Sequence, residues 1–470
     1  MKLALSRIAE FIAATGACDS RATAQGYSID SRTIQPGELF FAVKGDRLDG
    51  HDFVEQALAK GAVAAVVRKD NDQLPGYSAP ARLLAVEDTL VALQTLATAV
   101  RKLWGKTAIG ITGSMGKTTT KEALAHLLVP RYRVHRSKGN FNNHFGLPLG
   151  LLSLEPEYDL AVIEMGMSHA GEIAALARIA QPNEGVVTTV GPVHLEFFDS
   201  VAGIARAKYE LIEALPHGGT AFLNADDEYV CQFGRDFKGK VVLFGLKPSA
   251  DVRAENIGVL GPEGMRFDLV SQGVRQPVRS PLLGKHNVYN VLAAAAVALE
   301  HGVTPSEIAE ALPSLQAADK RGQVVQLGNI TVLYDCYNSS PKALMAAADT
   351  LAAMPARRRI VVAGEMLELG TTSEQLHRDC GRYIASKKLD FLLGVRGFAK
   401  PMVEAASEAG MKAEFVAMPE DAGEWLARET QDGDAVLLKA SRGVKLEKAL
   451  EAWQQKIGVS VVQSNAKTDH

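Results

Sequence analysis

The sequence has few cysteines, no long apolar run and almost no net charge. Its 470 residues include four cysteines whose spacing matches neither a metal site nor a disulfide framework, which indicates a reducing compartment. These are Cys18, Cys231, Cys336 and Cys380. The longest apolar runs, such as residues 291–299, are too short to span a bilayer, and Arg7 and Glu10 interrupt the N-terminal run. We therefore expect a cytoplasmic protein without an integral membrane segment.

The formal net charge is −3, so no basic field favours a nucleic-acid partner, and anionic ligands must be held by local sites. A chain of 470 residues, 47% hydrophobic and 22% charged, has the composition of an ordinary globular protein with several domains. Alternating strand and helix patterns predict three α/β units, over residues 1–84, 85–316 and 317–470. We expect a mostly parallel sheet in the second unit, and the third lacks the glycine fingerprint of a dinucleotide-binding domain.

One glycine-rich stretch organises the chain. Residues 110–120 read GITGSMGKTTT and lie between a predicted buried strand at 107–111 and a helical pattern at 118–128. Backbone N–H groups and a helix N-terminus converge on an anion at such a turn. Lys117 would add charge for the outer phosphates, and the Thr118 hydroxyl a ligand for Mg²⁺. Ile111 stands where the common phosphate loop has glycine, so this is a variant loop; a tight turn that binds nothing is the alternative.

Three downstream side chains extend this site. Glu164 ends a predicted strand at 159–164, where a nucleotide site needs a Mg²⁺ ligand, although a strand-end acid can simply face solvent. His194 follows the strand at 185–190, and a lone histidine there is more often a loop residue than a metal ligand. Lys208 falls on the apolar stripe of a helix at 201–215, so it must snorkel, pair or lose its charge. Modification of a nucleophilic Lys208 is the alternative to snorkelling.

Other polar clusters carry weaker signals. Residues 27–33, YSIDSRT, offer donors suited to a diphosphate, but the local sequence alone favours a turn with a surface ion pair. The loop at 138–146 has three asparagines, and asparagine-rich loops are usually turns. Residues 284–290, GKHNVYN, lead into an alanine-rich helix at 291–299, where histidine and asparagine would serve as caps or as partners of a base. Residues 364–370 read GEMLELG and follow a predicted strand at 358–363.

Together these motifs resemble the Mur ligases of peptidoglycan precursor synthesis, and most closely the member that adds D-alanyl-D-alanine. The resemblance covers nearly the whole chain. It implies a three-domain α/β fold: a small N-terminal UDP-sugar-binding domain, a central ATP-binding P-loop-type domain with a mostly parallel sheet, and a C-terminal Rossmann-like domain that binds the incoming dipeptide. The sequence departs from the family pattern at Met115 and Glu365, where the family favours Asn and Asp, and at Cys336, Ser339 and Ser340.

The resemblance also implies roles for individual residues. Substrate contacts would come from Ser28, Asp30, Ser31, Arg32, Asn140, Asn142 and Asn143. ATP contacts would come from Gly113, Ser114, Met115, Gly116, Lys117, Thr118, Thr119, His286, Asn287, Asn290, Arg321, Asp335 and Asn338. One Mg²⁺ would be held by Thr118 and Glu164, and a second by His194 and a carbamylated Lys208. The residues closest to the chemistry would be Lys117, His194, Lys208 and Arg321.

The activity implied by the resemblance is ATP-dependent joining of D-Ala-D-Ala to UDP-MurNAc-tripeptide through an acyl phosphate, by an enzyme that we expect to be monomeric. Two alternatives remain at this point. Another amino-acid ligase of the same family is disfavoured by the Asp30–Arg32 stretch, by residues 364–370 and by the lack of an Asp-Asn-Pro-Arg motif. A non-catalytic ATP-dependent scaffold would bind ATP without releasing phosphate, and it gives no reason for Lys208 on an apolar stripe.

Overall fold

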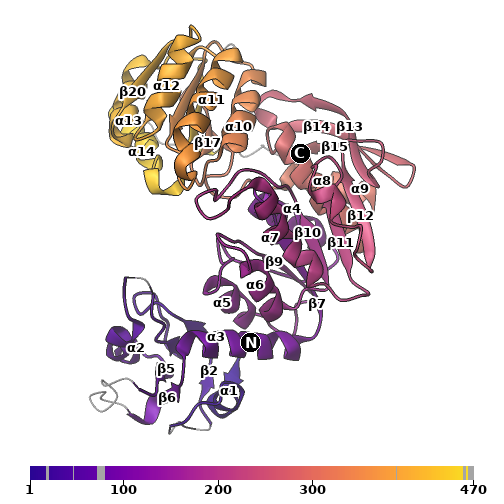
Figure 1. Ribbon diagram of the computed structural model, residues 1–470, viewed down its shortest axis with the longest axis vertical. Helices are drawn as coiled ribbons and strands as arrows, with labels where there is room; N and C mark the ends of the chain where they lie inside the picture. The colour runs from indigo at the N-terminus through magenta and orange to yellow at the C-terminus, as the bar shows by residue number, and fades with distance from the viewer. Residues whose placement is uncertain are drawn as a thin grey trace.

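A computed structural model describes residues 1–16, 19, 21–45, 47–70, 80–387, 389–458 and 462–463; Cys18 lies outside these residues. Three sheets follow one another along the chain, and a two-stranded ribbon of β1 (Leu3–Ala4) and β2 (Thr23–Ala24) precedes them. Figure 1 shows the N-terminal part at one end of the molecule, the central part in the middle and the C-terminal part at the other end. Among the described residues, no helix combines the length and apolar character that crossing a bilayer requires.

The N-terminal part is a small parallel sheet with strand order β3-β4-β5-β6. Its strands are β3 (Gly26–Ser28), β4 (Glu38–Phe41), β5 (Ala64–Arg68) and β6 (Leu83–Val86), and its short helices are α1 (Leu5–Phe11) and α2 (Val54–Ala59). Helix α3 (Thr89–Trp104) then leads to the central part. The Asp88 carboxylate caps α3 by accepting from two backbone N–H groups, and the helix buries a stripe that includes Leu93, Leu96 and Val100.

The central sheet has the order β15-β14-β13-β12-β11-β10-β7-β9-β8 and is parallel from β8 to β13. Its strands are β7 (Thr107–Thr112), β8 (Val134–Arg136), β9 (Leu160–Glu164), β10 (Glu184–Val187), β11 (Thr220–Asn224), β12 (Lys240–Gly245), β13 (Val252–Val259), β14 (Met265–Ser271) and β15 (Val274–Ser280). The last three strands pair antiparallel, β13 with β14 and β14 with β15.

Helices cover both faces of this sheet, as parallel strands require. One face buries Leu124 and Leu127 together with Leu292; the other buries Leu151, Leu176 and Leu211. The helices are α4 (Lys117–Leu128), α5 (Gly146–Leu152), α6 (Glu172–Ala180), α7 (Val201–Glu213), α8 (Lys285–Glu300) and α9 (Pro305–Ala311). Because β7, β9 and β10 are parallel neighbours, the loops that follow them meet at one edge of the sheet.

The C-terminal sheet has the order β20-β19-β18-β21-β17-β16-β22, parallel from β20 to β17. Its strands are β16 (Gln323–Leu327), β17 (Ile330–Asp335), β18 (Arg359–Gly364), β19 (Phe391–Val395), β20 (Ala413–Val416), β21 (Ala435–Lys439) and β22 (Val462–Gln463). Its helices are α10 (Pro341–Ala353), α11 (Ser373–Ser386), α12 (Ala399–Glu408), α13 (Pro419–Glu429) and α14 (Glu447–Ile457). Strand β18 confirms the strand expected at residues 358–363, and β20 and β22 lie at the two edges of the sheet.

Candidate active site

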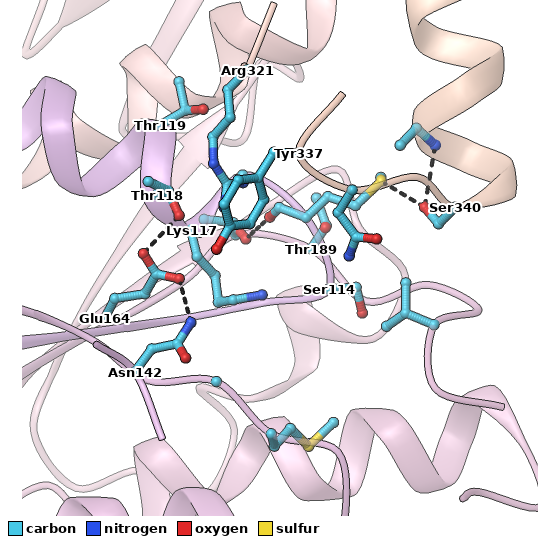
Figure 2. A pocket seen from close by; sticks show the side chains of 18 of the residues that line it. Ser114, Lys117, Thr118, Thr119, Asn142, Glu164, Thr189, Arg321, Tyr337 and Ser340 are labelled. Carbon is cyan, nitrogen blue, oxygen red and sulfur yellow. Dashed lines mark hydrogen bonds between the residues drawn. The ribbon is translucent and has the colours of Figure 1, made fainter. Parts of the chain in front are cut away.

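A cavity of about 520 Å³ lies at the carboxyl edge of the central sheet and is lined from both the central and the C-terminal parts. Figure 2 shows Lys117, Thr118 and Glu164 from the central part of the chain facing Arg321 and Tyr337 from the C-terminal part. The predicted residues that line this cavity are Ser114, Met115, Gly116, Lys117, Thr118, Thr119, Asn142, Asn143, Glu164, His194, His286, Asn287, Asn290, Arg321, Asp335 and Asn338. The structure therefore brings together side chains that are more than two hundred positions apart in the sequence.

The loop between β7 and α4 requires glycine at two positions. Gly113 and Gly116 have φ angles of 149° and 84°, and a Cβ at either would lie 1.9 Å from Thr188 Oγ1 or 2.1 Å from Asn290 Oδ1. The Lys117 ammonium donates to the Gly113 carbonyl at 2.8 Å and so folds over the loop. Burial lowers the pKa of Lys117, Glu164 opposes this shift, and Arg321 adds to it. An anion at this loop would compensate the two cations.

Glu164 is buried at the end of β9, with 1% of its surface exposed, and both its oxygens have partners. Thr118 Oγ1 donates to Oε2 at 2.7 Å, and Asn142 Nδ2 donates to Oε1 at 2.8 Å. The Lys121 ammonium lies 3.9 Å from Oε2. A hydroxyl and a carboxylate in contact at a phosphate loop are the hard oxygen donors that Mg²⁺ takes, with phosphate and water completing its shell. Within the described residues, no cluster of three or more His, Cys, Asp or Glu side chains forms a metal site by itself.

His194 lies between the two parts of the cavity wall. Its φ is 56°, a left-handed conformation that few non-glycine residues adopt. Nδ1 of its ring lies 2.5 Å from Oε2 of Glu368, a residue of the C-terminal part. The Glu368 pKa is lowered, chiefly by this hydrogen bond. The ring nitrogen Nε2 has no hydrogen-bond partner among the residues that the structure describes, which leaves it available as a ligand atom.

Lys208 is buried in α7, with 1% of its surface exposed, on the stripe formed by Ile204, Leu211 and Ile212. Its ammonium group makes no hydrogen bond or ion pair with any described residue, so it does not snorkel to solvent. Burial lowers its pKa well below the usual value, and the positive charge of Lys117 lowers it further. The arrangement favours a neutral, nucleophilic amine beside the phosphate loop. Lys208 is not among the residues that line the cavity.

Helix α8 begins one turn earlier than its alanine-rich segment suggests. Its N-cap is Gly284, so His286 and Asn287 lie inside the first turn and do not cap the helix with their side chains. Asn287 donates to the Leu283 carbonyl at 2.7 Å, and Asn290 donates to Asn287 Oδ1 at 2.9 Å. Burial lowers the pKa of His286 to about 4, and its buried Nδ1 has no partner among the described atoms. A neutral imidazole with an unpartnered nitrogen fits a heterocyclic ligand.

The C-terminal part contributes two cationic side chains. The Arg321 guanidinium stacks over the Tyr337 ring, 3.9 Å from its centroid, which fixes its planar group beside the loop. Lys439 ends the buried strand β21; its ammonium lies 2.5 Å from Asp335 Oδ2 and 3.0 Å from the Asn338 carbonyl. These contacts tie the turn after β17 to β21 and hold Asp335 and Asn338 at the cavity.

The residues that depart from the family pattern make specific contacts in the structure. Ser340 caps α10, and its hydroxyl lies 3.5 Å from Met115 Sδ, so two unusual residues meet across the cavity. Glu365 packs over Gly397, where a Cβ would lie 2.2 Å from its Oε1. Cys336 is buried and donates to the Leu438 carbonyl at 3.3 Å, in the C-terminal core. Despite these departures, the predicted ATP contacts Met115, Asp335 and Asn338 all line the cavity.

Apart from Gly113 and Lys208, five predicted site residues do not line this cavity. Ser28, Asp30, Ser31 and Arg32 belong to the N-terminal part, and Asn140 is exposed in the loop after β8. Arg32 and Asp30 form an exposed bidentate pair with a shortest distance of 2.7 Å, which is the surface ion pair considered above as the alternative. Ser31 is buried and donates to Gln56 Oε1 at 2.7 Å.

Sequence reasoning assigned no role to Lys121, Lys439, Tyr337 or Glu368, although all four support or line the site. Lys121 carries the same signal that identified Lys208, since it falls on the buried stripe of α4 three positions before Leu124. Lys439 ends an otherwise apolar strand, which is also unusual for a lysine. The contacts of Glu368 and Tyr337 depend on how distant segments meet, and no local pattern predicts them.

Comparison with known families gives matches along most of the chain. The model described as "Mur ligase family, catalytic domain" matches residues 23–101. "Mur ligase middle domain" matches residues 111–298, and "Mur ligase, glutamate ligase domain" matches residues 320–442. The three matches follow one another in the order of the three sheets.

Individual relatives match over nearly their whole length. The UDP-N-acetylmuramoyl-tripeptide--D-alanyl-D-alanine ligase of Bacillus subtilis is 34% identical over 457 residues, covering 96% of this chain and 98% of its own. A crystal structure of MurF from Acinetobacter baumannii superposes with a TM-score of 0.88 at 30% identity, covering 97% and 99% of the two chains. MurF of Thermotoga maritima in complex with ADP gives a TM-score of 0.80 at 28% identity, covering 93% and 98%.

Proposed function

The chain belongs to the Mur ligase family, and we propose that it is an ATP-dependent ligase that joins D-alanyl-D-alanine to UDP-N-acetylmuramoyl-tripeptide in peptidoglycan precursor synthesis. The products would be the pentapeptide precursor, ADP and phosphate. The tripeptide carboxylate would attack the γ-phosphate of ATP, and the dipeptide amine would displace phosphate from the resulting acyl phosphate. Such a reaction needs charge neutralisation and alignment rather than a protein nucleophile.

One observation carries this proposal: a phosphate loop, a buried carboxylate and a guanidinium from another part of the chain converge on one cavity. Lys117 and Arg321 would neutralise the phosphates from opposite sides. Gly113 to Thr119 would surround the phosphates with backbone N–H groups. His286, Asn287, Asn290, Asp335 and Asn338 would bind the nucleoside, with the unpartnered nitrogen of His286 facing the base.

Thr118 and Glu164 fit one Mg²⁺, because both present hard oxygen atoms at the loop. His194 and a carbamylated Lys208 would hold a second ion. Mg²⁺ bound there would stabilise the charge that develops as the γ-phosphate is transferred. Carbamylation requires the neutral amine, and the lowered pKa of Lys208 supplies it. A carbamate carbon signal from ¹³C-labelled bicarbonate, lost in Lys208→Ala, would test this; no signal in the wild-type protein would contradict it.

The three parts of the chain would divide the substrates among them. Residues 1–84 would bind the UDP-sugar through Ser28, Asp30, Ser31 and Arg32, with the Asp30–Arg32 pair opening toward the diphosphate. Residues 85–316 would bind ATP, with Asn140, Asn142 and Asn143 contacting the acceptor peptide. Residues 317–470 would bind the dipeptide. We further propose a monomer in the cytoplasm, where nucleotide substrates and reduced cysteines are found.

Phosphate release tests the proposal directly. The protein is incubated with ATP, Mg²⁺, UDP-MurNAc-tripeptide and each of a panel of dipeptides. We expect release that requires both the tripeptide and D-Ala-D-Ala, and no release in Lys117→Ala because its phosphate contact is lost. A dependence on a single amino acid would instead identify another ligase of the family. ATP binding without release would identify a scaffold, and unchanged kinetics in Lys117→Ala would remove the phosphate-loop assignment.

A further inference from the structure

One contact of the cavity wall joins the two halves of the site. The loop 364–370 of the C-terminal part reaches the loop after β10, where Glu368 meets the ring of His194 at 2.5 Å. The backbones also meet: Glu196 N–H donates to the Glu368 carbonyl at 3.4 Å, and a Cβ on Gly370 would lie 3.3 Å from Glu196 Cα. Glu368 has a φ of 63°, a left-handed conformation like that of His194.

The loop that presents Glu368 is held rigidly from within its own domain. Met366 N–H donates to His377 Nε2 at 2.9 Å, and the other nitrogen of that buried ring lies 2.7 Å from the Ser373 carbonyl. The two contacts fix the tautomer of His377, with a proton on Nδ1 and an acceptor at Nε2. Leu367 N–H donates to Ser441 Oγ at 3.0 Å. The position of Glu368 therefore follows the position of the whole C-terminal domain.

A carboxylate on one nitrogen of a histidine determines what the other nitrogen can do. It keeps the proton on Nδ1, fixes the plane of the ring and leaves Nε2 as the basic atom. His194 lines the cavity, and its Nε2 is without a partner in the described part of the chain. The ring is thus oriented as a ligand by a residue of another domain.

We propose that Glu368 is a positioning residue, which orients His194 for the second metal ion only when the C-terminal domain is docked on the central one. This inference rests on the proposed function, because the ion is the one that the ligase reaction would use. Binding of the second ion would therefore depend on domain docking. With the C-terminal domain displaced, His194 loses its carboxylate partner and the second metal position is incomplete. Phosphoryl transfer would then require docking of the domain that binds the dipeptide.

The experiment measures metal binding rather than turnover. Full-length protein with β,γ-methylene ATP, which is not hydrolysed, is titrated with Mn²⁺ and followed by electron paramagnetic resonance. Loss of a side chain that orients a ligand typically weakens metal binding about 10- to 100-fold, and we expect this for the weaker Mn²⁺ site in Glu368→Ala. Glu368→Gln keeps an acceptor for Nδ1–H and should recover part of the affinity. Glu374→Ala removes an exposed carboxylate nearby and should leave both sites unchanged.

A second comparison shows whether Glu368 acts through His194. In a His194→Asn background, Glu368→Ala should cause no further loss of Mn²⁺ affinity, because the residue to be oriented is absent. Equal Mn²⁺ binding in wild type and Glu368→Ala would overturn the proposal, as would additive losses or the lack of a second Mn²⁺ in the wild type. Phosphate release by the wild-type protein is measured separately, so an inactive protein with the expected Mn²⁺ losses would reject the proposed function alone.

Discussion

Two helices beside the phosphate loop each bury a lysine completely, and the two lysines differ in what surrounds them. Lys121 in α4 has 0% of its surface exposed, and Lys208 in α7 has 1%. The Lys121 ammonium donates to the Ser137 carbonyl at 2.7 Å and the Gly139 carbonyl at 3.2 Å, and it pairs with Glu122 at 3.1 Å. Lys208 has no such partner among the described residues, and its pKa is lowered strongly by burial.

The comparison separates a structural lysine from a reactive one. A buried ammonium is stable where carbonyls and carboxylates replace its water, as they do around Lys121. Where nothing replaces the water, the group loses its proton and becomes a nucleophile, as expected for Lys208. Burial is the same in both cases, so it is the set of partners that distinguishes the roles. The four predictions that follow test this distinction.

The largest effect is expected on activity in Lys208→Ala. Without the amine no carbamate can form, so the second metal ion loses a ligand and phosphate release should fall at least about 1,000-fold, which corresponds to about 4 kcal/mol of transition-state stabilisation. High bicarbonate should not restore turnover. Phosphate release with ATP, tripeptide and D-Ala-D-Ala measures this, with circular dichroism to confirm folding. Full activity would show that Lys208 is no more than a buried side chain.

Lys121→Met should affect stability instead. Removing the ammonium leaves the Ser137 and Gly139 carbonyls and the buried Glu164 without their cation, and breaking a buried pair costs about 3 kcal/mol or more. Urea unfolding measures the loss. Lys102→Met, at an exposed position of α3, serves as the control and should change stability by less than about 0.5 kcal/mol. Equal stabilities of the two variants would mean that the partners of Lys121 contribute nothing.

Lys208→Met should change stability in the opposite direction. In protein free of metal and bicarbonate, the substitution replaces an unpartnered amine by an apolar side chain and should stabilise the fold near neutral pH, where the folded lysine has given up a proton that the unfolded one binds. The gain should shrink as pH rises toward 10.5. Below that pH the unfolded lysine binds a proton that the folded one releases, so the stability of the wild type rises with pH, by up to about 1.4 kcal/mol per unit. A gain that does not depend on pH would contradict the lowered pKa.

The sequence predicted the parts of this site that depend on local patterns. An apolar run predicts β7, the glycines predict the phosphate loop, and a helical stripe predicts α4. The apolar stripe of α7 includes Lys208. The buried stripe of α4 indicates Lys121 in the same way. The pairing of His194 with Glu368 could not be predicted, because it depends on how two domains dock. At Asp30 and Arg32 the local pattern was compatible with a ligand site as well as with a surface ion pair. The structure has the ion pair.

The smallest effect is expected for Glu122→Gln, which removes one partner of Lys121 and leaves the others. Glu122 is partly exposed and also pairs with Arg136 at 3.2 Å, so the loss in stability should be about 0.5–1 kcal/mol. The Ser137 and Gly139 carbonyls still accept from the Lys121 ammonium, so no carbamate should form there. Incubation with ¹³C-labelled bicarbonate should then give the single carbamate signal of Lys208. A second signal would show that one carboxylate, rather than the whole set of acceptors, keeps Lys121 unreactive.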